Sequence, residues 1–398
     1  MRIESSRYTE RFGSVRINEV QSVLELDSGR ATDSPPTKNI AVQKIEEDVI
    51  KDFEGKMAVA VPVMNEKLKL FEGVISGVPH DCLIIVVSNS RRKRIDRFKM
   101  ERESLELFCH FTQRQAVIIH QKDPILAQAL VKAGYTDMLG EDGLVRSGKA
   151  EGMMVAMLLA MATNKEYIGF VDADNYFPGA VWEYVRCFSS GLSMAPSPYA
   201  MIRIQWRYKP KAAAGMFFKK WGRVSEVTNK CMNALIANKT GFETEIIKTG
   251  NAGEHAMSLR LAEFLPYASG YAVEPQELVS IFEGFGGFLP IARGAPAKHG
   301  VDILQIETRN PHLHEEKGFQ HLKKEMLLPG IGTIYHSPLC EEATRKLVLD
   351  ELLKAGVIKS EEEPPRPHIM APLKNIDLPK FKEAMAEHMN SYWVLEGK

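Results

Sequence analysis

The sequence has few cysteines and no pattern that pairs them. Its 398 residues include 5 cysteines, which are scattered, odd in number and never arranged as C-x-x-C. A disulfide framework is therefore not expected, and reduced thiols that mainly fill the core of a cytoplasmic protein fit better.

An excess of charge of one sign is also missing. Lys and Arg together number 51, as do Asp and Glu. A neutral total gives no argument for binding nucleic acid or an anionic membrane. Any site for an anion must be built locally, from a few side chains and backbone amides.

Long apolar runs are absent. The N-terminal residues 1–7 mix charges and have no apolar centre, which excludes a visible signal peptide. The most apolar helical run, Gly152–Ala162, is too short to span a bilayer and lies between Glu151 and Lys165. We therefore expect a cytoplasmic protein without a membrane partner.

Two nucleotide-binding fingerprints do not occur. The first apolar strand, Met57–Val63, runs into Met64, Asn65 and Glu66 without G-x-G-x-x-G, which argues against a nicotinamide- or flavin-binding Rossmann domain. No G-x-x-x-x-G-K-[ST] is present, which argues against a P-loop enzyme.

What the sequence does contain is a regular alternation of strands and helices. Apolar runs predict strands and helical spacing of apolar residues predicts the helices between them. The expected strands are Met57–Val63, Cys82–Val87, Ala116–Ile119 and Tyr167–Val171, and the expected helices include Asn65–Ile75, Ile125–Ala133 and Lys149–Thr163. This order predicts an α/β fold: a mostly parallel sheet with helices on both faces.

The flanking regions are less regular. Residues 1–56 place Ile17, Val20, Val23 and Leu24 at helical spacing and are predicted to be a leader that packs on the core. Residues 57–180 form the regular half, and 181–340 form a second half with a strand at 200–208 and loops at 249–255, 284–287 and 294–300. Residues 341–398 are predicted to be a helical tail.

Two carboxylates follow the last strand of the regular half. Asp172 and Asp174 lie two residues apart, so in extended chain both side chains point the same way and can converge on a cation or a diphosphate. Asp-x-Asp can also simply end a strand and begin a turn.

The carboxyl ends of parallel strands gather at one edge of a sheet, where ligands of such folds bind. Other polar tips should join Asp172 and Asp174 at that edge. They are Pro62, Val63, Asn65 and Glu66 after the first strand, Ser88 after the second and Gln121 after the third.

These motifs together resemble the GT-A glycosyltransferases, and further segments extend the resemblance. The chain is similar to the mannosyl-3-phosphoglycerate synthase family in residues 145–151, 222–226, 249–255, 270–275 and 307–314, and in the leader at 8–13. The resemblance implies a GT-A-like fold with an acceptor-binding second half. It also implies transfer of mannose from GDP-mannose to D-3-phosphoglycerate with retention of configuration, giving the precursor of the compatible solute mannosylglycerate.

The resemblance further implies a divalent metal, with Mg²⁺ first and Mn²⁺, Co²⁺ or Zn²⁺ as substitutes. Asp172 and Asp174 are its expected oxygen ligands, and a histidine from 312–314 adds a nitrogen ligand; His314 is favoured over His312. Lys149 begins a helix, where its ammonium and the free amides suit the diphosphate.

Substrate contacts are assigned in the same way. Glu66 either accepts hydrogen bonds from the amino and imino groups of guanine or is an acid at a helix start. Asn251 and an anion cradle at a helix start, made of Gly222, Arg223, Val224 and Ser225, are expected to hold phosphoglycerate. Glu274 is a possible catalytic acid. If the acceptor instead attacks from the face from which the leaving group departs, no carboxylate nucleophile is needed.

Three alternatives remain open at this point. A glucosyl-3-phosphoglycerate synthase-like transferase would share the fold. A sugar-phosphate nucleotidyltransferase would carry a Gly-rich basic loop after its first strand, which is missing here. A non-catalytic sugar-nucleotide-binding protein would need no metal carboxylates. The family resemblance also implies a homodimer.

Overall fold

The computed structural model describes residues 1–26, 42–207, 209–213, 215–219, 223–290, 294–314, 321–386 and 393–395. Side chains are described in these ranges except at 209–213, 215–219, 223, 321 and 393–395. The strands are β1 (Arg2–Glu4), β2 (Thr9–Phe12), β3 (Val15–Glu25), β4 (Val42–Lys44), β5 (Met57–Val63), β6 (Leu83–Ser88), β7 (Ala116–His120), β8 (Tyr167–Phe170), β9 (Ala200–Trp206), β10 (Lys209–Ala213), β11 (Gly215–Lys219), β12 (His255–Ser258), β13 (Tyr267–Ala268), β14 (Val301–Thr308), β15 (Ile369–Met370) and β16 (Trp393–Leu395).

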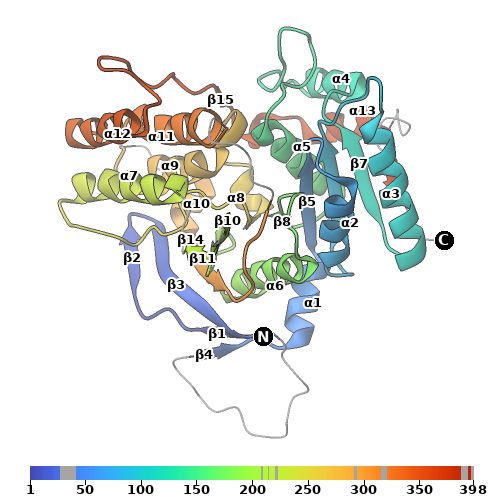
Figure 1. The fold of residues 1–398 in the computed structure, drawn as a ribbon, viewed down its shortest axis with the longest axis horizontal. Coiled ribbons are helices and arrows are strands. Elements are labelled where there is room, and N and C mark those ends of the chain that lie inside the picture. The colour runs from blue at the N-terminus through green and yellow to red at the C-terminus, as the bar shows by residue number, and fades with distance from the viewer. Residues whose placement is uncertain are drawn as a thin grey trace, which may run out of the picture.

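The helices alternate with these strands in the first half and cluster later in the chain (Figure 1). They are α1 (Glu47–Gly55), α2 (Leu68–Gly77), α3 (Arg97–Thr112), α4 (Pro124–Lys132), α5 (Lys149–Ala162), α6 (Pro178–Met194), α7 (Arg223–Thr240), α8 (Leu259–Ala262), α9 (Val273–Phe285), α10 (Gly294–His299), α11 (Leu328–Tyr335), α12 (Glu342–Ala355) and α13 (Leu378–Ala386).

One large sheet runs through the molecule. In the described residues it has 12 strands in the order β16-β7-β6-β5-β8-β12-β9-β14-β3-β1-β4, with β2 paired to β3. The pairs from β7 to β8 are parallel, β12 is antiparallel to both its neighbours, and β9, β14 and β3 are again parallel. From β7 to β3 every strand except β12 therefore points the same way, which confirms the predicted mostly parallel α/β sheet.

Helices cover both faces of this sheet, and each face has its own apolar core. Along β6, Ile84 and Val86 point into a core that includes side chains of α1, α2, α3 and α6. Ile85 and Val87 point the other way, into a core shared with α4, α5, α7, α9, α11 and α12. Strands buried on both faces explain why the sequence reads as continuous apolar runs.

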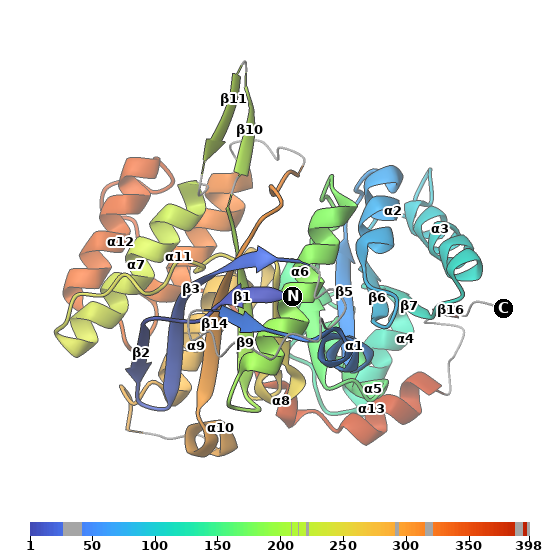
Figure 2. The ribbon, with the colours of Figure 1, turned by 90° about the horizontal axis from the view of Figure 1, so that it is seen from below.

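The regular half follows the sequence prediction closely. The four expected strands are β5, β6, β7 and β8, and the three expected helices are α2, α4 and α5. In Figure 2 the two halves lie side by side, with α6 between them and the β10–β11 hairpin projecting from one end.

The helical reading of the leader was wrong. Ile17, Val20 and Val23 belong to β3, an 11-residue strand that pairs in parallel with β14. The register shifts between Ile303 and Gln305, opposite Ile17 and Val20. This irregularity breaks the two-residue alternation, so the apolar residues of the strand fall three residues apart and imitate a helix.

The second half is more regular than its sequence indicated. It adds β9, β12 and β14 to the central sheet, and the buried helix α9 was not predicted. Residues 294–299 form α10 where a loop was expected. The helical tail was predicted correctly at α12 and α13. Both halves contribute strands to one sheet. The proposed division of the chain into four segments stays a prediction.

Two further predictions concern side chains and hydropathy. All five cysteines are free and buried, as expected of thiols that fill the core. Within the part of the chain that the structure describes, no helix is long and apolar enough to cross a membrane.

Candidate functional site

The loop after β5 is joined to the tip of β6. Asn65 adopts a left-handed backbone conformation (φ 64°), which asparagine tolerates better than most residues. Its amide donates to Ser90 Oγ at 2.8 Å, and its Oδ1 accepts from the Arg91 amide at 3.0 Å. The Glu66 carboxylate accepts from the Met64 amide. Asn65 and Glu66 thus lie at the predicted edge.

The other strand tips are fixed in the same region, partly by a buried carboxylate. Ser88 and Ser90 each donate a hydroxyl hydrogen bond of 2.6 Å to Glu101. Burial raises the pKa of Glu101, and the two serine hydrogen bonds oppose that rise. The Ser88 hydroxyl therefore faces the protein interior. Pro62 is half-buried and Val63 buried at the end of β5.

Gln121 connects the third strand tip to the start of α5. Its amide donates to the Ser88 carbonyl at 2.7 Å. Its side chain donates to the carbonyls of Arg146 at 2.6 Å and Gly148 at 3.1 Å. These hydrogen bonds therefore hold the turn that precedes Lys149 against the sheet. Arg146 donates through Nε to the Leu139 carbonyl at 3.0 Å.

Lys149 is the centre of an ion-pair cluster. Its Nζ lies 2.7 Å from Asp172 Oδ1 and 2.8 Å from Glu274 Oε1. Burial alone would lower the pKa of Lys149, but the two carboxylates outweigh it and hold the pKa well above its usual range. The side chain thus stays a cation at the edge where the two strand-end carboxylates lie. Glu274, from the first turn of α9, is brought to this edge from the second half of the chain.

The two aspartates differ in exposure. The Asp172 side chain is 35% exposed, whereas Asp174 is only 5% exposed. A Cβ on Gly253 would lie 2.9 Å from Asp172 Oδ2 and 3.4 Å from Lys149 Nζ. The backbone of the 249–255 loop therefore approaches the cluster so closely that a side chain at 253 would compete for its space.

Beneath the aspartates lies a buried amide–carboxyl pair that sequence reasoning did not single out. Asn175 Nδ2 donates to the Asp172 carbonyl and to Glu254 Oε1, both at 3.0 Å. Burial, followed by the neighbouring Asp172 charge, raises the pKa of Glu254 to about 8. Asn175 Oδ1 and Glu254 Oε2 are buried and have no hydrogen-bond partner in the described part of the chain.

The two candidate histidines have different surroundings. His312 is buried; its ring stacks on Trp206 with centroids 4.1 Å apart, and its Nδ1 lies 3.2 Å from the Tyr184 hydroxyl. His314 is half-buried and forms an isolated antiparallel bridge with Asn175, so its backbone lies beside the Asp172–Asp174 segment. His314 therefore adjoins the Asp172–Asp174 segment, whereas His312 is part of a packed aromatic cluster and its Nδ1 lies 3.8 Å from Glu254 Oε1.

Glu183 on α6 holds the segment that carries these histidines. Its carboxylate accepts from the amides of Arg309 at 2.6 Å and Asn310 at 2.8 Å, and from the Asn310 side chain at 2.6 Å. Because Glu183 is fully buried, these bonds fix where the segment leaves β14.

The predicted acceptor contacts lie on α7 and on the 249–251 loop. Val224 and Ser225 are in the first turn of α7, while Gly222 and the side chain of Arg223 lie outside the described residues. The Gly250 amide donates to Asn229 Oδ1 of α7 at 2.7 Å, which joins the two segments. Asn251 Oδ1 is buried and accepts no hydrogen bond from the described residues.

A fully buried arginine connects this loop to the ion-pair cluster. Arg203 donates to the Thr249 carbonyl at 2.8 Å and to the Glu274 carbonyl at 3.0 Å, and it pairs with Glu277 Oε2 at 3.2 Å. Glu277 Oε1 in turn lies 3.2 Å from His255 Nε2. One charged network thus positions both the 249–251 loop and the helix that carries Glu274.

Sequence reasoning missed Arg203, Glu254 and Glu183, because a buried charged residue has no local sequence pattern. In the described residues, no group of three or more His, Cys, Asp or Glu side chains is arranged so that it could hold a metal ion. Any ion at this edge would therefore draw part of its coordination shell from substrate or water.

Comparisons with known proteins agree on one family. The family model described as mannosyl-3-phosphoglycerate synthase matches residues 5–385. The mannosyl-3-phosphoglycerate synthase of Pyrococcus furiosus is 46% identical over 387 residues, which are 97% of this chain and 97% of that protein. The protein of the same name from Aeropyrum pernix is 38% identical over 385 residues, covering 96% of this chain and 97% of the relative.

Among solved structures, glucosyl-3-phosphoglycerate synthase from Mycobacterium tuberculosis in complex with uridine diphosphate matches with a TM-score of 0.49 at 18% identity. The match covers 86% of this chain and 98% of that chain.

Proposed function

Because the chain belongs to the mannosyl-3-phosphoglycerate synthase family of glycosyltransferases, we propose that it transfers mannose from GDP-mannose to D-3-phosphoglycerate with retention of configuration. The observation that carries the proposal is the placement of the Lys149 ammonium, Asp172 and Asp174 at one edge of a parallel sheet, where such folds bind nucleotides. The product is mannosyl-3-phosphoglycerate, the precursor of mannosylglycerate.

The donor diphosphate is proposed to bind at the start of α5. Lys149 stays protonated between two carboxylates, and the first amides of a 14-residue helix point toward the same edge. A cation together with free helix amides favours a diphosphate. Asn65 and Glu66, fixed at the tips of β5 and β6, are proposed to contact the guanosine part, and Pro62, Val63, Ser88 and Gln121 shape the wall behind it.

A divalent metal is proposed to bind beside the diphosphate, with phosphate oxygens and water completing its coordination shell. Asp174, Asp172 and His314 supply carboxylate oxygens and an imidazole on neighbouring backbone segments, and the unsatisfied Asn175 Oδ1 and Glu254 Oε2 lie just beneath. We assign the nitrogen ligand to His314, since His312 is buried and engaged with Trp206 and Tyr184. When bound, Mg²⁺ would neutralise charge on the departing diphosphate.

The acceptor is proposed to bind across from the donor, between α7 and the 249–251 loop. Arg223 and the α7 amides at Val224 and Ser225 supply positive charge and donors for the phosphate or carboxylate of 3-phosphoglycerate. The unsatisfied Asn251 Oδ1 can accept from its hydroxyl. Arg203 holds this loop and α9 in fixed relation, which aligns the acceptor with the donor.

Retention is proposed to follow from attack on the same face as the leaving group. Glu274 is only 5% exposed, and its Oε1 lies 2.8 Å from Lys149 Nζ. A carboxylate that is held by a buried ammonium is a poor nucleophile. Glu274 is therefore assigned to positioning Lys149, and rate enhancement is assigned to alignment and charge stabilisation.

The test is a transfer assay with purified protein. GDP-mannose, UDP-glucose and GDP-glucose are each incubated with Mg²⁺, with and without 3-phosphoglycerate, and products are followed by NMR. The proposal predicts an α-mannoside from GDP-mannose that requires 3-phosphoglycerate. A β-product would exclude retention. A preferred glucosyl donor would select the glucosyl-3-phosphoglycerate synthase-like function, and binding of GDP-mannose without turnover would select the non-catalytic one.

Three finer assignments belong to the same proposal. We infer that Mg²⁺ is the working metal, that the chain acts in the cytoplasm and that it forms a homodimer. Sedimentation of the purified chain tests the last of these: a species of one chain mass at micromolar concentration would contradict it.

A further inference from the structure

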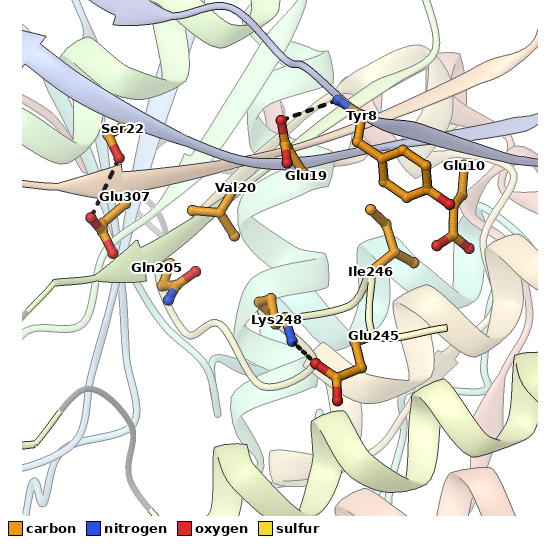
Figure 3. Close-up of a pocket in the computed structure, with 10 residues that line it drawn as sticks. All are labelled: Tyr8, Glu10, Glu19, Val20, Ser22, Gln205, Glu245, Ile246, Lys248 and Glu307. Atoms are coloured by element: carbon orange, nitrogen blue, oxygen red, sulfur yellow. Dashed lines mark hydrogen bonds and ion pairs between the residues drawn. The ribbon is translucent and has the colours of Figure 1, made fainter. Parts of the chain in front are cut away.

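A second pocket lies apart from the Lys149 cluster. It has a volume of about 560 Å³ and opens between β3, β9, β14 and residues 245–248 (Figure 3). The described residues that line it include none of those assigned above to donor, metal or acceptor. We call it the acidic pocket, because its lining includes Glu10, Glu19, Glu245 and Glu307.

The charge of the acidic pocket is strongly negative. Among the described residues, its lining has four carboxylates and one ammonium, that of Lys248, which pairs with Glu245 at 2.9 Å. The formal net charge of the whole protein is zero, so these residues form a local concentration of negative charge. A pocket lined in this way attracts cations and repels phosphorylated substrates.

Glu307 and Glu10 lie toward opposite ends of the pocket, with apolar side chains between them; Glu19 also lies between the ends, and its Oε1 accepts from the amides of Arg7 at 2.7 Å and Tyr8 at 3.1 Å. Glu307 pairs across the sheet with Ser22 of β3, whereas Glu10 pairs with Ile17 near the other end of that strand. Positions 17 and 22 are roughly 16 Å apart at the rise of a strand. In Figure 3, Val20 and Ile246 lie between the two acidic ends. This arrangement fits a ligand with separated charges and an apolar middle.

A third observation points independently to a hydrogen-bond donor in the ligand. Gln205 is 4% exposed, and its Oε1 is buried without a hydrogen-bond partner in the described residues. It lies next to Glu307 in the sheet register and lines the acidic pocket, with its oxygen directed inward in Figure 3. An unsatisfied buried carbonyl is costly, and an N–H donor would satisfy it.

We propose that the acidic pocket is a binding site for an alkyl diamine or polyamine. One ammonium binds between Gln205 Oε1 and Glu307, a second binds near Glu10 and Glu245, and the methylene chain packs on Val20 and Ile246. A divalent metal ion would use only one of the two ends and would leave the apolar middle unfilled.

The experiment is calorimetric titration of the full-length protein with spermidine and with 1,5-diaminopentane at constant ionic strength. We expect saturable binding of one molecule per chain, and at least tenfold weaker binding of pentylamine, which has one ammonium. Glu307→Gln and Glu245→Gln should each weaken spermidine binding about tenfold. Glu103→Gln, the same change on the exposed face of α3, should leave binding unchanged.

Glu245 keeps the test valid if Glu307→Gln fails to fold, because its side chain is 80% exposed. The proposal is overturned if spermidine does not saturate, or if pentylamine binds as tightly as the diamine. It is also overturned if Mg²⁺ at equal ionic strength displaces spermidine as well as a diamine does, or if Glu103→Gln weakens binding as much as Glu245→Gln.

Discussion

The ammonium of Lys149, in the first turn of α5, lies 2.7 Å from Asp172 Oδ1 at the end of β8. This contact joins the helix start that suits a diphosphate to the carboxylates that suit a metal. Glu274 Oε1, 2.8 Å away on the other side, is the third member of the cluster and comes from a helix more than 100 positions later in the chain.

Replacing Lys149 by Met should affect both stability and donor binding. The change leaves Glu274 buried without its cation, which typically costs about 3 kcal/mol, while Asp172 can recover part of its hydration. We expect a lower free energy of unfolding in urea and a weakened affinity for GDP. Lys99→Met, at an exposed ion pair, serves as control and should change stability by less than about 0.5 kcal/mol. Unaltered GDP affinity in Lys149→Met would remove Lys149 from the donor site.

Asp174→Asn should abolish metal-dependent transfer while the fold persists. The amide keeps the shape of a side chain that is only 5% exposed but removes the charge that a divalent ion needs. We expect mannosyl transfer to fall by at least about 100-fold, with a circular dichroism spectrum like that of the parent. Asp350→Asn on the exposed side of α12 is the matched control. Normal turnover by the Asp174→Asn variant would exclude this aspartate as a ligand.

Arg223→Ala should act on the acceptor. We expect the KM for 3-phosphoglycerate to rise by at least about tenfold, since one charged hydrogen-bonding group is lost, while GDP affinity remains the same. Lys230→Ala, about two turns further along α7 and paired with Glu351 at the surface, controls for loss of a positive charge on that helix. Parallel losses for donor and acceptor would instead mean that Arg223 supports the fold.

The protein without substrates should lose stability as pH rises toward 8, partly because of Glu254. Its pKa is raised from the ordinary value of 4.5 to about 8 by burial and by the Asp172 charge. Between these values the folded state keeps a proton that the unfolded state releases, so the free energy of unfolding falls with pH, by at most about 1.4 kcal/mol per unit. The glutamine of the Glu254→Gln variant cannot ionise, so its melting temperature should depend less on pH between pH 5 and 8. An identical pH slope in both proteins would show that Glu254 ionises normally.

The sequence was sufficient for the parts of the site that depend on local pattern. Apolar runs followed by Asp172, Asn65 and Gln121 predicted which residues share an edge, because parallel strands place their carboxyl ends together. The contacts of Lys149 with Glu274 and of Arg203 with the Thr249 carbonyl could not be predicted. The residues of these two contacts are 125 and 46 positions apart in the sequence. A periodic pattern of apolar residues does not predict contacts over such separations.

The strand β3 shows a second limit. Its register shift opposite Ile303 and Gln305 removes the alternation by which a strand is recognised, so Ile17, Val20 and Val23 indicated a helix. Its partners in the sheet include β14, nearly 300 residues later, and such a distant pairing leaves no local pattern in the sequence.

The account depends above all on a divalent ion held by Asp174 and His314 against the diphosphate of GDP-mannose. Its most direct test is a crystal structure of the protein with GDP-mannose and Mn²⁺, in which anomalous scattering locates the metal. We predict a manganese peak within coordination distance of the Asp174 carboxylate, the His314 imidazole and the diphosphate, with Lys149 beside the phosphates. A nucleotide bound elsewhere, with Asp172 and Asp174 facing solvent and no metal between them, would contradict the account.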